Sequence, residues 1–221
     1  MLSESGVRQR YGDCFYHAVL WLNKNGYSVY PKGITIVTTR TVRDIVVVST
    51  SQAIHLLDWP QRPGSARRLH ILVSILETIS LQKEACTKAT NNVTYFRVED
   101  DTATAVESLH FDCAVPPDKQ HPICHVQNDR RHVAPPESFT HKIDATPLQA
   151  RCQNIRVPTA FVNMPGLFAI LAADHMSPAH WTDFMDGCLA HFQGIPALAP
   201  NTQVDKAIPK ERLSTWAWYE K

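Results

Sequence analysis

Two runs of β-branched residues in the first quarter of the chain place the strongest constraint on its fold. Residues 33–39 and 44–49 are dense in isoleucine, valine and threonine, side chains that suit the pleated surface of a strand. Residues 40–43 between them form a link short enough for a hairpin. The uninterrupted apolar run 45–48 indicates a central strand covered on both faces. The sequence therefore predicts a fold built on a sheet.

Helical spacing of apolar residues predicts further elements before residue 90. Asp13 can cap a helix over residues 14–22, whereas the polar residues 1–11 are expected to be frayed. A helical turn is predicted over 53–59. The apolar positions after Ser65 favour an amphipathic helix that continues to Lys88.

The middle of the chain returns to strand patterns. Asn91 and Asn92 indicate a turn, and residues 93–98, 103–113 and 121–128 follow as strands joined by short loops. These three segments predict an antiparallel meander. Residues 129–150 show no sustained period and are expected to form a long loop.

The last third of the chain is expected to be helical. Pro165 suits a first helical position, and Ser177-Pro178 opens a second apolar helix. A proline-rich connector over 196–209 precedes a short C-terminal helix over 210–219. The whole chain, 1–221, is interpreted as a single α+β domain: a mostly antiparallel sheet of about five strands with helices packed on it and a helical C-terminal third.

Composition narrows the functional classes. The apolar fraction of 44% and the charged fraction of 19% are ordinary for a folded protein. We expect a cytoplasmic protein without membrane contact, because neither an export signal nor an apolar run of about 20 residues is visible. The six cysteines are then expected to be reduced and buried. With eight glycines and no glycine-rich phosphate loop, nucleotide binding through a P-loop or a Rossmann turn is excluded.

The segments 108–113 and 121–128 carry the only concentration of potential chemistry in the chain. Strand alternation places His110 and Asp112 on one face of the first segment, and His121 and His125 on one face of the second. If the strands pair, these four side chains meet, and imidazoles with a carboxylate are usual ligands for Zn or Mn. The sequence therefore suggests a divalent-metal site whose catalytic candidates are His110, Asp112 and His125.

Other interpretations of the same segments remain open. Arg130 and Arg131 could hold a phosphate beside a metal-bound water, which would make the protein a hydrolase of the nuclease or phosphodiesterase type. A Cys113 or Cys124 nucleophile is disfavoured, because both cysteines fall on the face opposite the imidazoles. Alternatively, the histidines only satisfy structural hydrogen bonds.

Charge distribution favours binding over catalysis. Residues 1–98 carry a net charge of +6 and residues 99–221 one of −5, a split that suits contact with nucleic acid or with a charged protein, or attraction between two surfaces of the same fold. Arg67 and Arg68 are additional candidates for phosphate contact. Aromatic residues in the last third provide a possible interaction patch: Trp181, Phe184, Phe192, Trp216, Trp218 and Tyr219.

The sequence thus leads to two hypotheses. The first is a non-catalytic interaction protein, a component of a larger assembly that contacts protein or nucleic acid. The second is a metal-dependent hydrolase with its site at residues 110–125. The pattern does not distinguish a protein partner from a nucleic acid and does not give the oligomeric state.

Overall fold

The structure is a computed structural model, which describes residues 2–31, 36–42, 44–114, 124–129, 131–144, 157–159 and 161–199. It contains three helices, α1 (Glu4–Lys24), α2 (Met164–His175) and α3 (Pro178–Phe192). The strands in chain order are β1 (Ser28–Tyr30), β2 (Ile36–Val42), β3 (Ile45–Thr50), β4 (Ile54–Pro60), β5 (Arg68–Ser74), β6 (Leu76–Ser80), β7 (Ala85–Glu99), β8 (Thr102–Ala114), β9 (Cys124–Asn128), β10 (Lys142–Ile143) and β11 (Val157–Pro158).

The long strand β7 organises the sheet, which has 11 strands in the described part of the chain. β5 and β6 lie end to end along one edge of β7: residues 70–74 pair with 92–96, and residues 77–80 pair with 85–89. The other edge of β7 pairs with β8, which in turn pairs with β9. All these pairs are antiparallel, and only the short β10 is parallel to its neighbour β8. The sheet is therefore divided on one side of β7 and continuous on the other.

The division falls at Ile75, between β5 and β6. The backbone groups there are satisfied by side chains, because the Ile75 amide donates to Thr50 Oγ1 at 3.3 Å and the Leu76 amide donates to Asn91 Oδ1 at 3.2 Å. The Thr50 amide also donates to the Ile75 carbonyl at 3.1 Å. These bonds let the chain change strand partners without leaving buried polar groups unpaired.

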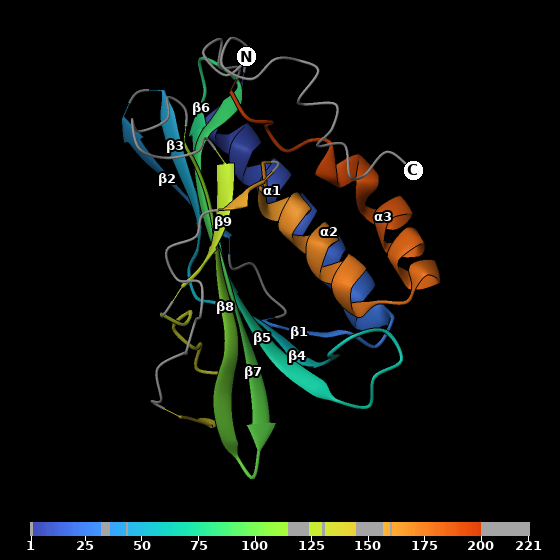
Figure 1. The fold of residues 1–221 in the computed structure, drawn as a ribbon. Helices are drawn as coiled ribbons and strands as arrows, with labels where there is room; N and C mark the ends of the chain where they lie inside the picture. Colours follow the sequence, from blue (N-terminus) through green and yellow to red (C-terminus); the bar gives the residue numbers. More distant parts are fainter. Residues whose placement is uncertain are drawn as a thin grey trace.

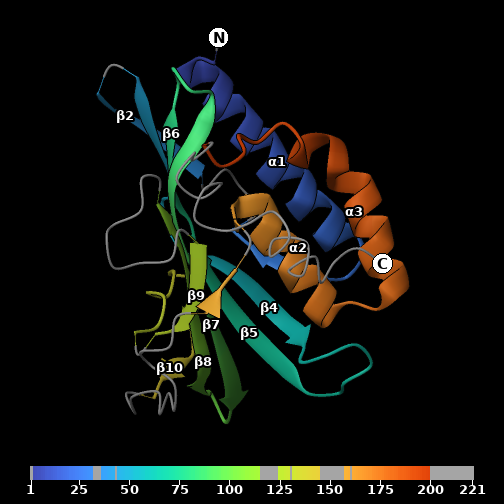
Figure 2. The same ribbon diagram turned by 45° about the horizontal axis from the view of Figure 1, so that its top comes forward.

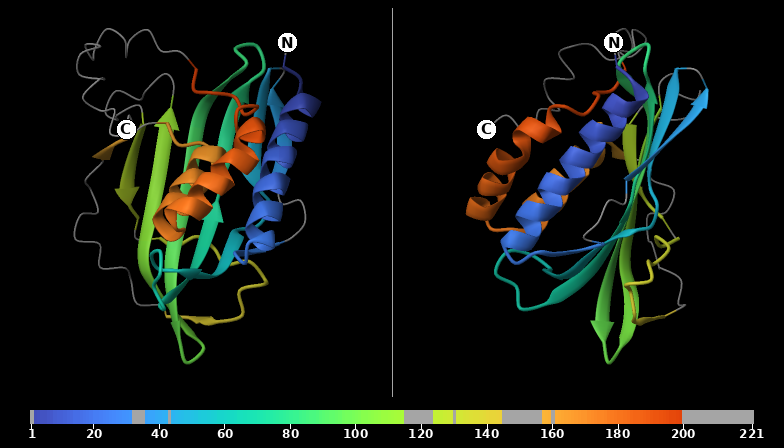
Figure 3. Two further views of the ribbon diagram at one scale, coloured as in Figure 1. Left: turned by 90° about the vertical axis from the view of Figure 1, so that its right-hand side faces the viewer. Right: turned by 180° about the vertical axis from the view of Figure 1, so that it is seen from behind.

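All three helices cover one face of the sheet (Figures 1 and 3). Each begins at a side-chain cap, in which Ser3, Asn163 and Ser177 accept a hydrogen bond from an amide in the first turn. Figure 2 shows α1 and α3 side by side, and Gly187 permits this close approach, because a Cβ there would lie 3.0 Å from the Trp21 ring. The main hydrophobic core lies between these helices and the sheet.

The segment 131–144 packs on the opposite face of the sheet. It encloses a second, smaller core, which consists of Ala53, Leu72, Phe96, Ala103, Val133 and Phe139. Side chains of β5, β7 and β8 beyond this core remain partly uncovered, and there the polar residues of the sheet gather.

One carboxylate is completely buried between the sheet and the helices. Glu77 of β6 is 0% exposed. Its Oε1 accepts from the Met164 amide at 2.6 Å and from Asn91 Nδ2 at 3.2 Å, and its Oε2 accepts from Tyr11 Oη at 2.5 Å. Burial raises the pKa of Glu77, and the hydrogen bonds from Tyr11, Asn91 and Met164 act against that rise. The group thus connects α1, β6, β7 and the start of α2.

Several sequence predictions are confirmed. The fold is mixed α and β with a large antiparallel sheet. The hairpin of residues 33–49 is present as β2 and β3, and the meander is present as β7, β8 and β9. The two helices predicted after Pro165 and Ser177 are α2 and α3.

Other predictions were wrong. The sheet has more than twice the expected five strands, because the predicted helix over 65–88 is β5, β6 and the start of β7, and the predicted turn over 53–59 is β4. Five of the seven positions of β5 are buried in an unbroken run from Leu69 to Val73, so its burial does not alternate and the spacing of its apolar residues resembles that of a helix. Asn91 and Asn92 lie within β7 rather than in a turn.

The N-terminal segment also differs from expectation. Residues 4–11, predicted to be frayed, form the first turns of α1, where Val7 and Tyr11 are buried one turn apart. Residues 131–144 contain the short β10 within the predicted loop. Residues 145–150, most of the connector 196–209 and the predicted helix 210–219 lie outside the described residues. In the described part of the chain, no helix has the length and apolar character needed to cross a membrane.

Truncation of Glu77 is expected to destabilise the fold strongly. Glu77→Ala leaves three buried donors without an acceptor and should lower the free energy of unfolding by about 3–5 kcal/mol. Glu77→Gln keeps one acceptor oxygen and should lower it by about 1–2 kcal/mol. The measurement is urea denaturation at pH 7, with the exposed Glu107→Ala as the control. Equal losses in Glu77→Ala and Glu107→Ala would contradict the structural role of the buried carboxylate.

Candidate functional site

The register of β8 and β9 agrees with the alternation predicted for the histidine-containing strands. Asp112 lies opposite His125, and His110 lies opposite Gln127. Directly opposed residues of an antiparallel pair project from the same face. His110, Asp112 and His125 therefore share the face that is turned away from the helices. Cys113 lies opposite Cys124 on the other face, where both pack in the main core.

These side chains share a face but have separate hydrogen-bond partners. His110 Nδ1 donates to Asn92 Oδ1 at 2.7 Å, and Asp112 Oδ1 accepts from Thr90 Oγ1 at 2.9 Å. The ring of His125 is buried, with a residue exposure of 2%. Among the described residues, no group of three or more histidine, cysteine or acidic side chains is arranged to hold a metal ion. His121 lies outside the described residues, so the four-residue metal site remains a prediction.

A cavity of about 430 Å³ lies on the same face of the sheet. We call it the loop-side pocket, and it is lined by Thr50, Gln52, Ala53, Ser74, Thr90, Asn92, His110, Asp129, Arg131, His132, Val133 and Ala134. Its floor comes from β5, β7 and β8, and its wall comes from the segment after β9. Nine of its 12 lining residues have polar side chains, so hydrogen-bonding groups are present around most of the cavity.

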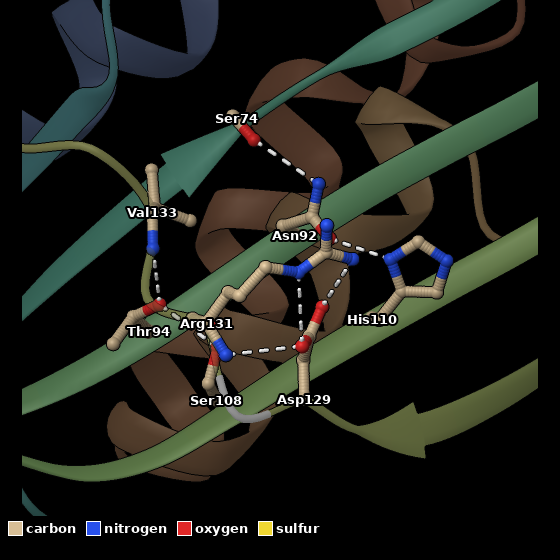
Figure 4. Close-up of polar contacts among 8 residues, drawn as sticks. All are labelled: Ser74, Asn92, Thr94, Ser108, His110, Asp129, Arg131 and Val133. Atoms are coloured by element: carbon tan, nitrogen blue, oxygen red, sulfur yellow. Dashed lines mark hydrogen bonds and ion pairs between the residues drawn. The ribbon is translucent and has the colours of Figure 1, made fainter. Parts of the chain in front are cut away.

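A chain of hydrogen bonds orients the floor of the pocket (Figure 4). Asn92 Nδ2 donates to Ser74 Oγ at 3.3 Å, while Asn92 Oδ1 accepts from His110 Nδ1. Because His110 Nδ1 carries the donated hydrogen, Nε2 is the acceptor nitrogen of the neutral ring. The three side chains come from three neighbouring strands, so the sheet fixes their spacing.

A second set of hydrogen bonds attaches the wall to the floor (Figure 4). The Val133 amide donates to Thr94 Oγ1 at 2.8 Å, and Ser108 Oγ donates to the Arg131 carbonyl at 2.8 Å. Thr94 and Ser108 are themselves joined at 3.0 Å. Both hydroxyl groups are buried, so these bonds hold residues 131–133 in a fixed position over β7 and β8.

Arg131 is the cation of the pocket. Its Nη2 and Nε lie 3.3 and 3.4 Å from the carboxylate oxygens of Asp129, and its side chain is 86% exposed. Burial acts to raise the pKa of Asp129, but hydrogen bonds from the Arg131 amide and guanidinium outweigh it and hold this pKa below its usual value. The carboxylate therefore stays ionised and orients the guanidinium at the rim.

The structure separates the other basic candidates from this pocket. Arg67 and Arg68 are exposed at the turn between β4 and β5, where the Arg67 carbonyl accepts from the Gln61 amide. Neither lines the pocket. Arg130 lies outside the described residues. Among the aromatic candidates, Phe184 and Phe192 are buried and Trp181 is 38% exposed, whereas Trp216, Trp218 and Tyr219 lie outside the described residues.

Sequence reasoning missed the floor residues Ser74 and Asn92, because their segments were assigned to a helix and a turn. The available signal was the alternation of Thr90, Asn92 and Thr94, which is typical of the polar face of a strand. The same error hid a histidine cluster under the segment 131–144. There His55 Nε2 lies 3.0 Å from His70 Nδ1, and His70 Nε2 lies 3.1 Å from Asp58 Oδ1.

This cluster consists of two buried imidazoles and a third ring at its edge. His141 lies with its ring centroid 4.8 Å from that of His70 and hydrogen-bonds to Asp101 Oδ1 at 3.1 Å. The pKa of His55 is lowered to about 4, mainly by burial and also by the neighbouring His70 and His141, while Asp58 acts against them. Burial also lowers the pKa of His70. Both rings are therefore neutral in the folded protein near pH 7.

No protein-family model, curated protein or solved structure matches the chain.

The buried histidines predict a loss of stability in mild acid. His55 titrates near pH 4 when folded and near about 6.5 when unfolded, so the unfolded chain takes up more protons between these values. The free energy of unfolding should fall as the pH decreases from about 6.5 to 4. His55→Phe should remove part of this slope, by up to about 1.4 kcal/mol per pH unit.

Urea denaturation at several pH values measures this effect. The exposed Leu20 provides a control, because Leu20→Phe adds an aromatic ring without removing a titratable group and should leave the slope unchanged. An identical pH slope in His55→Phe and the unmodified protein would contradict the assignment.

Proposed function

We propose that the protein is a non-catalytic binding protein and that its loop-side pocket holds a phosphate-bearing nucleotide of a single-stranded nucleic acid. One observation carries this proposal: hydrogen-bonding side chains from three strands, already oriented by one another, lie in one cavity with an exposed arginine at its rim. The volume of about 430 Å³ falls in the range of about 300–1,000 Å³ typical of ligand pockets.

Arg131 is suited to contact a phosphate. A guanidinium has five N–H donors, and Asp129 accepts from two nitrogens, Nε and Nη2. In the described part of the chain, the side-chain hydrogen bonds of Arg131 use only these two nitrogens. The remaining N–H groups can donate to phosphate oxygens. Planar arginine groups bind phosphate in a bidentate manner, and the high exposure of this side chain allows the approach of a polyanionic strand.

The floor of the pocket is suited to contact a base. Asn92 supplies a second amide hydrogen beside the one donated to Ser74, and His110 Nε2 supplies an acceptor. The edge of an unpaired base also combines donors and acceptors, and proteins recognise single strands mainly through such edges. A floor whose groups are already held in place loses little side-chain entropy when the base binds.

The described contacts favour binding over catalysis. His110 and Asp112 are each hydrogen-bonded to β7, through Asn92 and Thr90, rather than to each other. This arrangement gives His110 a fixed orientation but does not pair it with the carboxylate that a general base would use. The sequence-based preference for an interaction protein is therefore retained as the proposal.

Removal of the Arg131 guanidinium tests the phosphate contact. Arg131→Ala should weaken binding of a short labelled single strand in a fluorescence anisotropy titration, and it should reduce the slope of log K against log salt by about one. Arg62→Ala is the matched control, because Arg62 is exposed at the β4–β5 turn and its loss should change neither quantity.

A double variant at the β4–β5 turn separates the two basic regions. Arg67→Glu with Arg68→Glu should leave binding within about twofold of the unmodified protein. Loss of binding in this double variant, with Arg131→Ala unaffected, would place the nucleic-acid contact at the turn and contradict the proposal for the pocket.

Asn92 tests the base contact separately from the phosphate contact. Asn92→Ala removes the link between Ser74 and His110 and should weaken binding by about 1–3 kcal/mol. Because no charge is lost, the salt dependence should stay as in the unmodified protein. The same titration at two salt concentrations measures both quantities, and Thr104→Ala, exposed on β8, is the control. An unchanged affinity in Asn92→Ala would be incompatible with base recognition by the floor.

A further inference from the structure

Two cysteines face each other across the last pair of long strands. Cys113 of β8 is directly opposite Cys124 of β9. Cys113 is buried, and Cys124 is half-buried at the margin of the main core. Both cysteines lie on paired strands, so the register of β8 and β9 determines which residue each one faces.

The hydrogen-bond pattern identifies which kind of strand pair this is. The Asp129 amide donates to the Ser108 carbonyl at 2.9 Å, so these residues continue the register of β8 and β9 as a hydrogen-bonded pair. Hydrogen-bonded and non-hydrogen-bonded pairs alternate along an antiparallel ladder. The register runs without a shift from Leu109 to Cys113, so the cysteines, five positions from Ser108, form a non-hydrogen-bonded pair.

Non-hydrogen-bonded pairs bring opposed side chains closest together. Their Cα atoms lie about 4.5 Å apart, within the range of about 4.4–6.8 Å that a disulfide requires. A bond between these sulfur atoms therefore needs no movement of the two strands away from each other.

The two thiols are also chemically unequal. A hydrogen bond from Cys113 lowers the pKa of Cys124, although burial and Asp112 oppose this effect. The pKa of Cys113 is raised, most strongly by the same hydrogen bond and next by burial. The more exposed sulfur is thus the better nucleophile, and the buried sulfur lies ready to react with it.

We propose that Cys113 and Cys124 form a reversible disulfide site that links β8 to β9, with a low-molecular-weight disulfide such as oxidised glutathione as the oxidant. The Cys124 thiolate attacks one sulfur of the glutathione disulfide, forms a mixed disulfide and releases one glutathione thiolate. Cys113 then loses its proton to that thiolate and attacks the Cys124 sulfur, which releases the second glutathione. The second glutathione leaves as a thiolate and takes up from solvent the proton that Cys124 had lost. Two protein thiols are thus oxidised, and one glutathione disulfide is reduced to two thiols.

The bond would fix an edge of the sheet beside the loop-side pocket. β9 has five residues and pairs with β8 and the two-residue β11 in the described structure. It leads directly into Asp129, which lines the pocket. The disulfide proposal does not depend on what the pocket binds, because it rests only on the strand pairing and the thiol contact of the two cysteines.

Peptide mapping of the full chain tests the proposal. The reduced protein is incubated with oxidised glutathione, blocked with N-ethylmaleimide and digested with trypsin. Cleavage at the basic residues places Cys113 in peptide 98–119 and Cys124 in peptide 120–130, each with a single cysteine. We expect these two peptides to be joined after oxidation and to separate after treatment with dithiothreitol.

Single variants test the unequal roles of the sulfurs. In Cys113→Ser, Cys124 should accumulate as a glutathione adduct, because the resolving thiol is missing. In Cys124→Ser, Cys113 should carry at least about tenfold less adduct than Cys124 does in Cys113→Ser. Cys14 and Cys188, both buried in the helical layer, are the internal control and should remain reduced in the folded protein.

Three outcomes would overturn the proposal. One is a persistent glutathione adduct on Cys124 in the unmodified protein, which would show that Cys113 does not resolve it. The second is a link from Cys124 to Cys152 in place of Cys113. The third is the absence of oxidation at Cys113 and Cys124 while circular dichroism shows the unmodified protein to be folded.

Discussion

The buried carboxylate of Glu77 is the constraint on which the two layers of the protein depend. A carboxylate is expensive to remove from water unless donors replace its hydration. Here the donors come from α1, β7 and the first residue of α2, so the group is satisfied only when these elements are assembled. Asn91 extends the network, because its Nδ2 also donates to the Val162 carbonyl before α2. The position of α2 over the sheet is thereby specified by hydrogen bonds and not only by apolar packing.

The same part of β7 connects the core to the face that carries the loop-side pocket. Asn91 projects toward the helices and accepts a hydrogen bond from the Leu76 amide, where the chain passes from β5 to β6. Its neighbour Asn92 projects to the opposite face and orients His110. One dipeptide in β7 thus serves both faces of the sheet. Because β7 pairs with β5, β6 and β8, any shift of its register would move the floor of the loop-side pocket together with the core.

The sequence allowed prediction of those elements whose signals are local. The β-branched hairpin and the capped helices α2 and α3 follow from residues within each segment, such as Ser177 and Pro178. The segment 65–88 could not be assigned in this way, because the burial of β5 does not alternate along the strand. Glu77 and Asn91 illustrate the same limit, since their burial depends on partners far away in the sequence.

The candidate site was predictable in part for the same reason. Strand alternation placed His110, Asp112 and His125 on one face, and the register agrees with this. Arg131 was recognised as a cation, but its place in the pocket with His110 depends on two hydrogen bonds: one that the Val133 amide donates to Thr94, and one that Ser108 donates to the Arg131 carbonyl. Asn92 was missed because its segment was assigned to a turn, and Ser74 was missed because its segment was assigned to a helix. Local pattern thus identified the chemistry of single residues, while tertiary pairing determined which of them meet.

NMR mapping tests the proposal that the loop-side pocket binds a single-stranded nucleic acid. Amide and side-chain resonances are followed as a short single-stranded RNA is added to labelled protein. The account predicts that shifts concentrate at Ser74, Asn92, His110 and Arg131, with small changes at Arg67 and Arg68. Shifts confined to the β4–β5 turn or to the helical layer, or no shifts at all, would contradict it.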